Sequence, residues 1–358
     1  MKENRRSFLK LGATSAAAGM LGQGAHAAEL AAQQPQVAAI APLAAKLGLR
    51  LATFSPDKDA KPRVGVVLDD GRVIDVGAEA QRQKQKLLFD SGSMLSLIAS
   101  GDQGLAQAGA LAAKASLLRI ATPTVNQVRL WSPIPRPHSN IYAVGWNYLD
   151  HFEEGKEARA DKTVTTYPSN PVFFSKAINT MNGPFDSIPY DAANSTLIDW
   201  EAELAVIIGQ GGRNISEDQA MKHVFGYAAY NDTTARDVQQ KRHGGQWFKG
   251  KSLDGHGPMG PWIVTAAGLN LDDTRIICRV NGVEKQNASY QQMYFKIPRV
   301  IAELSRGLTL EAGDIIITGT PSGVGFGRKP PEFMKPGDLM ETEITGIGIL
   351  RNRIQAEA

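Results

Sequence analysis

The run Ile-Asp-Trp-Glu-Ala-Glu-Leu-Ala-Val-Ile-Ile-Gly at residues 198–209 alternates in the manner of a β-strand. One face of such a strand is apolar throughout and belongs in a hydrophobic core: Ile198, Trp200, Ala202, Leu204, Val206 and Ile208. The opposite face begins with three carboxylates, those of Asp199, Glu201 and Glu203, and then turns apolar. The segment therefore combines a core strand with a short row of acidic groups.

Glu201 and Glu203 are expected to project side by side, because side chains two residues apart on a strand share a face at a Cα separation of roughly 7 Å. Buried together, the two carboxylates would repel each other, and one of them would take up a proton. A bound divalent cation removes that penalty. The alternative is a solvated acidic face on an edge strand, which the Glu-x-Glu pattern alone does not exclude.

A second acidic segment, Tyr-Asn-Asp-Thr-Thr-Ala-Arg-Asp-Val-Gln at residues 230–239, has Asp232 where a strand is expected to meet a helix. A helix cap is the alternative role for this residue, since Asp and Asn are favoured there. Arg236 and Gln239 follow at the fourth and seventh positions, so the three side chains would line one helical face. A helix cap would explain the presence of Asp232, but it would not explain why Arg236 and Gln239 lie on the same helical face.

Glu201, Glu203 and Asp232 together would supply three carboxylates from two elements of the fold. The chain has one cysteine, Cys278, so metal sites built from several cysteines are excluded. Carboxylate oxygens select hard ions, which makes Mg²⁺ the expected cofactor, with Mn²⁺ or Ca²⁺ as alternatives.

Three further segments carry chemistry. His151 and Glu154 share a face if they form a helical turn, and a carboxylate beside an imidazole raises its basicity for activating water; a surface ion pair is the alternative. Lys251 lies among glycines and prolines, either as an exposed loop charge or as a fixed cation that reaches into a pocket. The small residues Thr-Gly-Thr-Pro-Ser-Gly-Val-Gly at 318–325 would let backbone N–H groups approach an anion.

The residues after the Pro-rich stretch at 133–137 are dominated by short β-rich runs: 141–144, 197–208, 275–280, 314–317 and 339–344. Helical patterns are fewer, at 216–223, 235–242 and 297–305. Because this mixture is not a βαβ array, the expected fold is α+β, with a mixed β-roll or β-barrel-like domain over residues 133–358. A small α+β module is expected before it, over residues 47–132.

The formal net charge of +3 lies entirely in residues 1–27, which hold four basic residues and one acidic one, so the remaining chain is neutral. A neutral body gives no electrostatic reason to expect nucleic acid, or a membrane once this leader is removed, as a partner. Arg5-Arg6, a short apolar stretch and a small-x-small site make residues 1–27 resemble a twin-arginine export signal, so a periplasmic protein is expected. A basic N-terminus on a cytoplasmic protein is the alternative. Residues 28–46 are expected to be a flexible lead-in.

Taken together, the segments between residues 141 and 354 resemble the fumarylacetoacetate hydrolase family. The matching elements are Asn147-Tyr148 with His151, Glu201-x-Glu203, Asp232 with residues 234–239, Gly250-Lys251-Ser252, and Thr318-Gly319-Thr320-Pro321. The resemblance implies a mixed β-roll catalytic fold, usually in a homodimer, and a small N-terminal accessory domain. Trp146 and residues 155–170 match no subgroup pattern, so the resemblance leaves the substrate open.

The resemblance also implies roles for individual residues. Mg²⁺ or Mn²⁺ would be held by Glu201, Glu203 and Asp232. A water-activating pair, His151 and Glu154, would sit on a short lid helix that orders when substrate binds, and Lys251 would face the metal-bound oxygens. The residues assigned to substrate binding are Tyr148, Arg236, Gln239 and Thr320.

The expected activity is metal-dependent hydrolysis of a C–C bond in an acylpyruvate or other 2,4-dioxo acid, through a metal-bound enolate. His151 would take a proton from water, which attacks the more distant carbonyl, and Lys251 would stabilise the departing carbanion. Decarboxylation, hydration or isomerisation of a 2-oxo acid are alternatives, because each can start from the same enolate. A non-catalytic periplasmic binder of sugar acids is the rival from another class, although a binder needs no base such as His151.

Overall fold

The structure is a computed structural model that describes residues 48–57, 60–156, 163 and 165–357. The predicted export signal and lead-in lie outside the described residues, so both stay predictions. The periplasmic location and the homodimer also stay predictions. Within the described ranges, no helix is long and apolar enough to cross a membrane.

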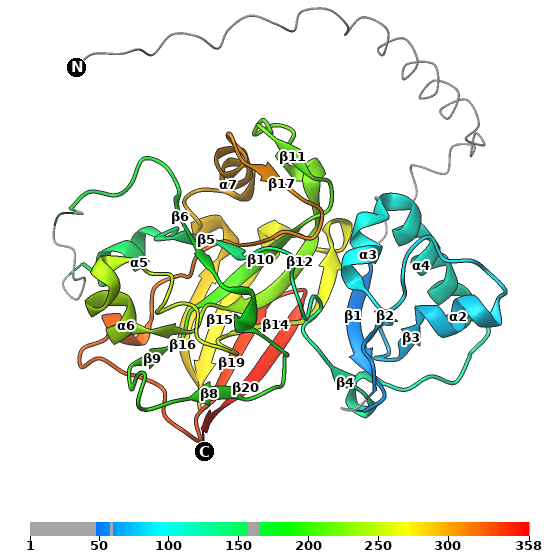
Figure 1. Cartoon of the computed structure of the whole chain (residues 1–358), viewed down its shortest axis with the longest axis horizontal. Helices are drawn as coiled ribbons and strands as arrows, with labels where there is room; N and C mark the ends of the chain where they lie inside the picture. The colour runs from blue at the N-terminus through cyan, green and yellow to red at the C-terminus, as the bar shows by residue number, and fades with distance from the viewer. Residues whose placement is uncertain (1–47, 58–59, 157–162, 164, 358) are drawn as a thin grey trace, which may run out of the picture. The chain divides into compact units, whose positions relative to one another are not determined.

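The largest sheet has eleven strands in the order β3-β2-β1-β14-β12-β10-β18-β5-β6, with β4 added beside β1 and β7 beside β14 (Figure 1). Its strands are β1 (Arg50–Ser55), β2 (Arg63–Val67), β3 (Val73–Asp75), β4 (Arg129–Leu130), β5 (Ile141–Gly145), β6 (Val172–Lys176), β7 (Met181–Asn182), β10 (Ala202–Ile208), β12 (Val224–Asn231), β14 (Gly257–Thr265) and β18 (Ile315–Ile317). The pairs β18–β5 and β14–β7 are parallel, whereas β10 is antiparallel to both of its neighbours. We call this sheet the central sheet.

β10 lies inside the central sheet, between β12 and β18, and all seven of its residues are buried. The edge-strand alternative for this segment is therefore wrong. The single predicted strand is interrupted, because Trp200 and Glu201 separate β10 from the short β9 (Ile198–Asp199). Their backbone N–H groups donate to side-chain oxygens of Asp199 (2.8 Å) and Asn231 (3.0 Å) instead of to a neighbouring strand.

A second sheet of five strands has the order β16-β15-β19-β20-β8. Its strands are β8 (Ile188–Tyr190), β15 (Arg275–Val280), β16 (Val283–Ser289), β19 (Leu339–Ile344) and β20 (Gly348–Ala356). Leu204 and Val206 of β10 share a core with Ile276 and Cys278 of β15 and with Met340 of β19. The apolar face predicted for residues 198–208 therefore lies between two sheets, and the predicted α+β class is confirmed.

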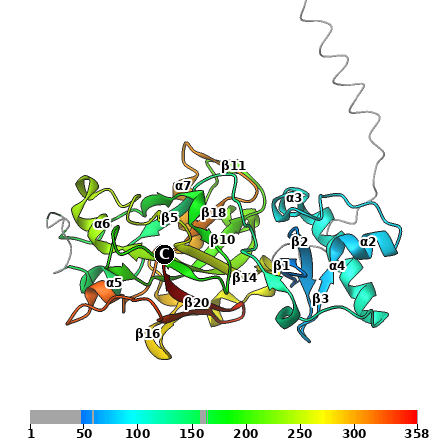
Figure 2. The ribbon, with the colours of Figure 1, turned by 60° about the horizontal axis from the view of Figure 1, so that its bottom comes forward.

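The N-terminal strands extend the central sheet, because Leu51 of β1 pairs with Ile263 of β14. Beside them lie α2 (Val76–Arg82), α3 (Met94–Ala99) and α4 (Gly101–Leu117), as Figure 2 shows. Leu111 of α4 belongs to the same core cluster as Ala205 and Ile207 of β10. The residues predicted to form a separate N-terminal module thus share both a sheet and a core with the residues that follow them.

The remaining described elements are short. They are α5 (Leu149–Glu154), α6 (Arg236–Lys241), α7 (Ile297–Leu304), the paired strands β11 (Gly212–Arg213) with β17 (Thr309–Leu310) and β13 (Thr234–Ala235) with β9, and the 3₁₀ turns η2 (Val125–Gln127), η3 (Ile178–Thr180), η4 (Ala220–His223), η5 (His243–Gly245), η6 (Ala266–Gly268), η7 (Leu271–Asp273), η8 (Tyr290–Gln292) and η9 (Gly325–Gly327). The helix expected at 216–223 is reduced to η4. Because α6 begins only at Arg236, after β13, Asp232 is not its cap.

Candidate active site and metal centre

Three carboxylates meet at the ends of β10 and β12. Glu201 lies just before β10, Glu203 lies within it, and Asp232 directly follows β12. Because Ala202 of β10 pairs with Asn231 of β12, the antiparallel register brings the three acids together. One oxygen of each lies within 4.8 Å of the others, and all three residues are buried. We call these three residues the acidic triad.

Three buried cations contact the acidic triad. The Lys251 ammonium donates to Glu201 Oε2 and to Asp232 Oδ2, both at 2.7 Å. Lys176 Nζ lies 2.7 Å from Asp232 Oδ1, and Arg236 Nη2 lies 2.7 Å from Glu201 Oε1. Each of these cations is at most 5% exposed, so the short contacts must offset a large desolvation penalty.

Glu203 is held by a backbone donor, because Gly319 N donates to its Oε2 at 2.6 Å. Burial, followed by the charges of Asp232 and Glu201, raises the pKa of Glu203 well above its usual value. Burial would also raise the pKa of Glu201, but nearby cations, Lys251 first, outweigh it and hold that pKa below its usual value. A divalent cation among the three acids would offset the repulsion at Glu203.

The composition of the cluster fits a hard divalent cation. The triad and the neighbouring Asp199 are four carboxyl groups near three cations, so with all four ionised the protein groups carry one net negative charge. Carboxylate oxygens are the ligands that Mg²⁺, Mn²⁺ and Ca²⁺ prefer. The residues that would hold such an ion are Glu201, Glu203 and Asp232.

Glu201→Gln is expected to weaken Mg²⁺ binding by at least about tenfold, because the substitution removes a ligand charge and keeps the size of the side chain. Isothermal titration calorimetry of the purified chain with Mg²⁺ measures this loss. The control is Glu217→Gln at an exposed position, which is expected to leave the affinity unchanged. An unaltered Mg²⁺ affinity in Glu201→Gln would contradict the ligand assignment.

Arg236 belongs to the protein framework around the triad. Its Nε donates to Asp199 Oδ2 at 2.8 Å, and its Nη1 donates to Gln239 Oε1 at 3.1 Å. Asp199 also accepts from the backbone N–H groups of Gly325 and Phe326, at 2.7 and 2.9 Å. Arg236 thus positions the acidic triad, and its predicted contact with substrate oxygens must compete with these protein acceptors.

The Gly-rich loop is tied to β10 by side chains as well as by its backbone. The Thr320 hydroxyl donates to Ala202 O at 2.9 Å and accepts from Gln286 Nε2 at 2.7 Å. Gln286 in turn accepts from Ala202 N at 2.9 Å. The hydroxyl therefore stabilises the loop, and the predicted contact of Thr320 with a substrate oxygen stays a prediction.

His151 and Glu154 form a hydrogen-bonded pair on α5. His151 Nδ1 lies 2.8 Å from Glu154 Oε1, and Glu154 Oε2 accepts from Gly323 N at 2.8 Å. The Gly-rich loop holds the carboxylate, and the carboxylate orients the imidazole. Because Nδ1 is engaged, Nε2 is the ring nitrogen left to accept a proton.

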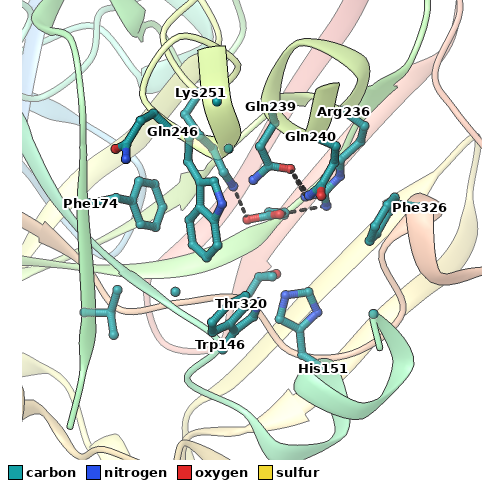
Figure 3. Close-up of a pocket in the computed structure, with 17 residues that line it drawn as sticks. Trp146, His151, Phe174, Arg236, Gln239, Gln240, Gln246, Lys251, Thr320 and Phe326 are labelled. Carbon is teal, nitrogen blue, oxygen red and sulfur yellow. Dashed lines mark hydrogen bonds and ion pairs between the residues drawn. The ribbon is translucent and has the colours of Figure 1, made fainter. Parts of the chain in front are cut away.

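A cavity of about 510 Å³ has Lys251, Arg236 and His151 among its lining residues (Figure 3). The predicted site residues that line it are His151, Glu201, Arg236, Gln239, Lys251 and Thr320. Glu203, Asp232 and Glu154 do not line it. Asp232 contacts the lining residue Lys251, Glu154 contacts His151, and a Glu203 oxygen lies within 4.8 Å of one of Glu201. Tyr148 does not line it, because its ring is 2% exposed and packs in the core between the two sheets. Tyr148 is thus outside the cavity lining, but it is close enough to the acidic triad that the charge of Glu203, after burial, raises the pKa of its hydroxyl. Its predicted contact with substrate stays a prediction.

Several residues that shape the site were missed from the sequence. Lys176 is fully buried against Asp232, and its only local signal is a lysine that closes the run Val-Phe-Phe-Ser-Lys. Gln286 lies on a strand with no motif around it. Phe174 and Trp247 line the cavity from two other segments. Their roles depend on partners far away in the sequence.

The buried acidic triad, its cations and the oriented histidine around one cavity are typical of enzymes that handle small, oxygen-rich molecules with a divalent cation. Residues 140–355 match the family described as fumarylacetoacetate (FAA) hydrolase C-terminal. The chain is 42% identical over 297 residues to oxaloacetate tautomerase YisK of Bacillus subtilis, covering 81% of this chain and 95% of the relative. It is 37% identical over 314 residues to the mitochondrial oxaloacetate tautomerase fahd2 of Xenopus laevis, covering 86% and 91%.

A solved structure is also similar. It is maleylpyruvate hydrolase from Sphingobium sp. SYK-6 in complex with manganese(II) ion and pyruvate, with a TM-score of 0.66 and 29% identity over 86% of this chain and 100% of that one. The chain belongs to the fumarylacetoacetate hydrolase family. Members of this family are enzymes, and they include tautomerases, isomerases and hydrolases.

Proposed function

We propose that the protein catalyses keto–enol tautomerisation of oxaloacetate or a similar 2-oxo acid with the help of a divalent cation. The observation that carries the proposal is the His151–Glu154 pair, which presents an oriented imidazole to the cavity that Glu201 and Lys251 also line. The likeness to two oxaloacetate tautomerases along most of the chain supports this reaction over the hydrolysis expected from the sequence.

Tautomerisation moves one proton from C3 of the 2-oxo acid to its C2 oxygen. His151 Nε2 takes the C3 proton, and the electron pair left behind forms the double bond between C2 and C3. The Lys251 ammonium, held between Glu201 and Asp232, stabilises the negative charge that develops on the C2 oxygen. The proton then passes from His151 to that oxygen. A bound divalent cation supplies Lewis-acid polarisation of the substrate oxygens.

Hydrolytic cleavage of an acylpyruvate is the second candidate, because the same pair suits the activation of water and because a maleylpyruvate hydrolase has a similar fold. In that reaction His151 takes its proton from water instead of from C3. Decarboxylation and hydration have no separate observation in their favour. Simple binding of a sugar acid is disfavoured, since Glu154 orients a base that a binder does not need.

The test is to follow both reactions with one preparation of the purified chain in Mg²⁺ or Mn²⁺. Ketonisation of enol-oxaloacetate is followed by its ultraviolet absorbance, and cleavage of acetylpyruvate by the release of acetate and pyruvate. We expect rapid, EDTA-sensitive ketonisation and little or no cleavage. Cleavage of acetylpyruvate without acceleration of ketonisation would replace the tautomerase proposal with the hydrolase one, and the absence of both would refute each.

A further inference from the structure

Aromatic side chains cover part of the cavity wall. We call Trp146, Phe174 and Trp247 the aromatic wall; all three are half-buried and line the cavity. The Trp247 ring meets Trp146 edge to face at a centroid distance of 5.0 Å and Phe174 at 5.3 Å. In Figure 3, Phe174 lies across the cavity from Arg236 and Phe326. The cavity therefore has a charged part and an apolar part.

The backbone is adapted to this wall. Trp146 follows β5 with a φ of 53°, a left-handed conformation that is unusual for a bulky residue. Gly145 lies beneath the Trp247 ring, and a Cβ there would come within 2.5 Å of Trp247 Cζ3. A glycine is thus required where the indole packs against the end of β5. Strained backbone of this kind is found at functional sites more than elsewhere.

Lys251 connects the two parts of the cavity. Its Nζ lies 2.7 Å from oxygens of Glu201 and Asp232, and it also lies 5.2 Å from the centroid of the Phe174 ring. Phe174 and Lys176 are two residues apart on β6, so their side chains share one face of the strand. The Phe174 ring therefore lies close to the ion pair between Lys176 and Asp232. If a molecule binds near the acidic triad through its oxygens, the atoms next to those oxygens will contact the aromatic wall.

The cavity has room for a larger ligand than a small diacid such as oxaloacetate. A volume of about 510 Å³ lies within the roughly 300–1,000 Å³ of sites that enclose drug-sized ligands, and a four-carbon acid fills only part of it. Among the described lining residues, the lysine and the arginine, Lys251 and Arg236, are already paired with protein carboxylates. A second carboxylate on the substrate would therefore meet no lysine or arginine that is not already paired with a protein carboxylate.

We propose that the cavity prefers 2-oxo acids with a planar apolar group on C3, of which phenylpyruvate is the simplest. The inference rests on the proposed function for its chemistry, since the same C3 proton moves to the same C2 oxygen. The wall supplies edge-to-face and stacking contacts for a ring, and these contacts exclude water from it. The aromatic wall recognises the apolar group on C3, and not the 2-oxo acid part of the ligand.

The experiment measures binding of pyruvate and of phenylpyruvate to the Mg²⁺-loaded chain by isothermal titration calorimetry, because the two ligands differ only in the ring. Phenylpyruvate is expected to bind at least about tenfold more tightly. Trp247→Ala is expected to remove most of this difference and to leave pyruvate binding within about twofold. Phe174→Leu is the second variant, and Phe248→Ala, an exposed neighbour outside the wall, is the matched control.

Equal dissociation constants for the two ligands in the unmodified chain would overturn the inference. Equal losses of affinity for both ligands in Trp247→Ala and Phe174→Leu would overturn it as well. Each variant is checked for its fold by circular dichroism and thermal unfolding. Tight phenylpyruvate binding without tautomerisation of either phenylpyruvate or oxaloacetate would leave the aromatic wall supported and would refute the proposed function. A failure of the aromatic-wall inference can therefore be distinguished from a failure of the proposed function.

Discussion

His151→Ala is expected to lower kcat/KM for oxaloacetate tautomerisation by about 100- to 10,000-fold, the usual contribution of a positioned general base. The physical reason is that the substitution removes the Nε2 acceptor, while the contacts that hold the acidic triad remain. Glu154→Gln is expected to cause a smaller loss, because glutamine can still accept a hydrogen bond from Nδ1 but lacks the charge that supports an imidazolium. Steady-state kinetics at saturating Mg²⁺ measure both effects.

His223→Ala is the matched control, since His223 lies outside the cavity and its Nδ1 contacts Gln210 O. Mg²⁺ affinity is measured alongside the kinetics and is expected to stay within about twofold of the unmodified value for His151→Ala, since His151 is not among the three acids. Full activity in His151→Ala would eliminate the proposed proton transfer. Loss of Mg²⁺ binding in the same variant would instead assign His151 to the metal centre.

Lys176→Met is expected to lower the free energy of unfolding by about 3 kcal/mol, because it leaves one oxygen of Asp232 as a buried charge without its partner. Both groups are fully buried, so water cannot replace the lost ion pair. The value lies at the lower end of the range for broken buried pairs, because Lys251 still contacts Asp232. Urea unfolding in EDTA measures the change without a contribution from bound metal.

A double-mutant cycle separates this ion pair from the packing of the lysine stem. Lys176→Met combined with Asp232→Asn is expected to cost at least about 1 kcal/mol less than the two single changes added together. Lys222→Met, at an exposed position, is expected to change stability by no more than about 0.5 kcal/mol. Strict additivity in the cycle would show that Lys176 stabilises the fold through its packing and its hydrogen bonds to Thr233 O and His256 O, and not through Asp232.

The acidic triad was predictable because its three members obey local rules. Glu201 and Glu203 are two residues apart in a segment with a strand pattern, and their carboxylates do converge. Asp232 was selected from its place between a strand and a helix; the alternative role as a helix cap is wrong, and the β10–β12 register brings it to the triad. His151 and Glu154 were paired by helical spacing, and the hydrogen bond follows that spacing.

Contacts between distant segments were not predictable in the same way. Thr320 carries a hydroxyl suited to a substrate oxygen, but Ala202 and Gln286 already use it. Tyr148 lies in the sequence motif with Asn147 and His151, yet its ring is packed in the core. In each case the side chain has more than one chemically reasonable partner, and only packing selects between them.

From the sequence alone follow the α+β class, the choice of Glu201, Glu203 and Asp232 as carboxylates suited to a hard cation, and the histidine–glutamate pair, because these depend on residue type and on local patterns along single elements. The tertiary structure alone establishes that Lys176, 56 positions from Asp232, neutralises it inside the protein, and that Trp247 and Phe174 form one wall. Those contacts are set by the order and register of strands in the central sheet. Strand order and register join residues far apart along the chain, and neither local spacing nor composition determines them.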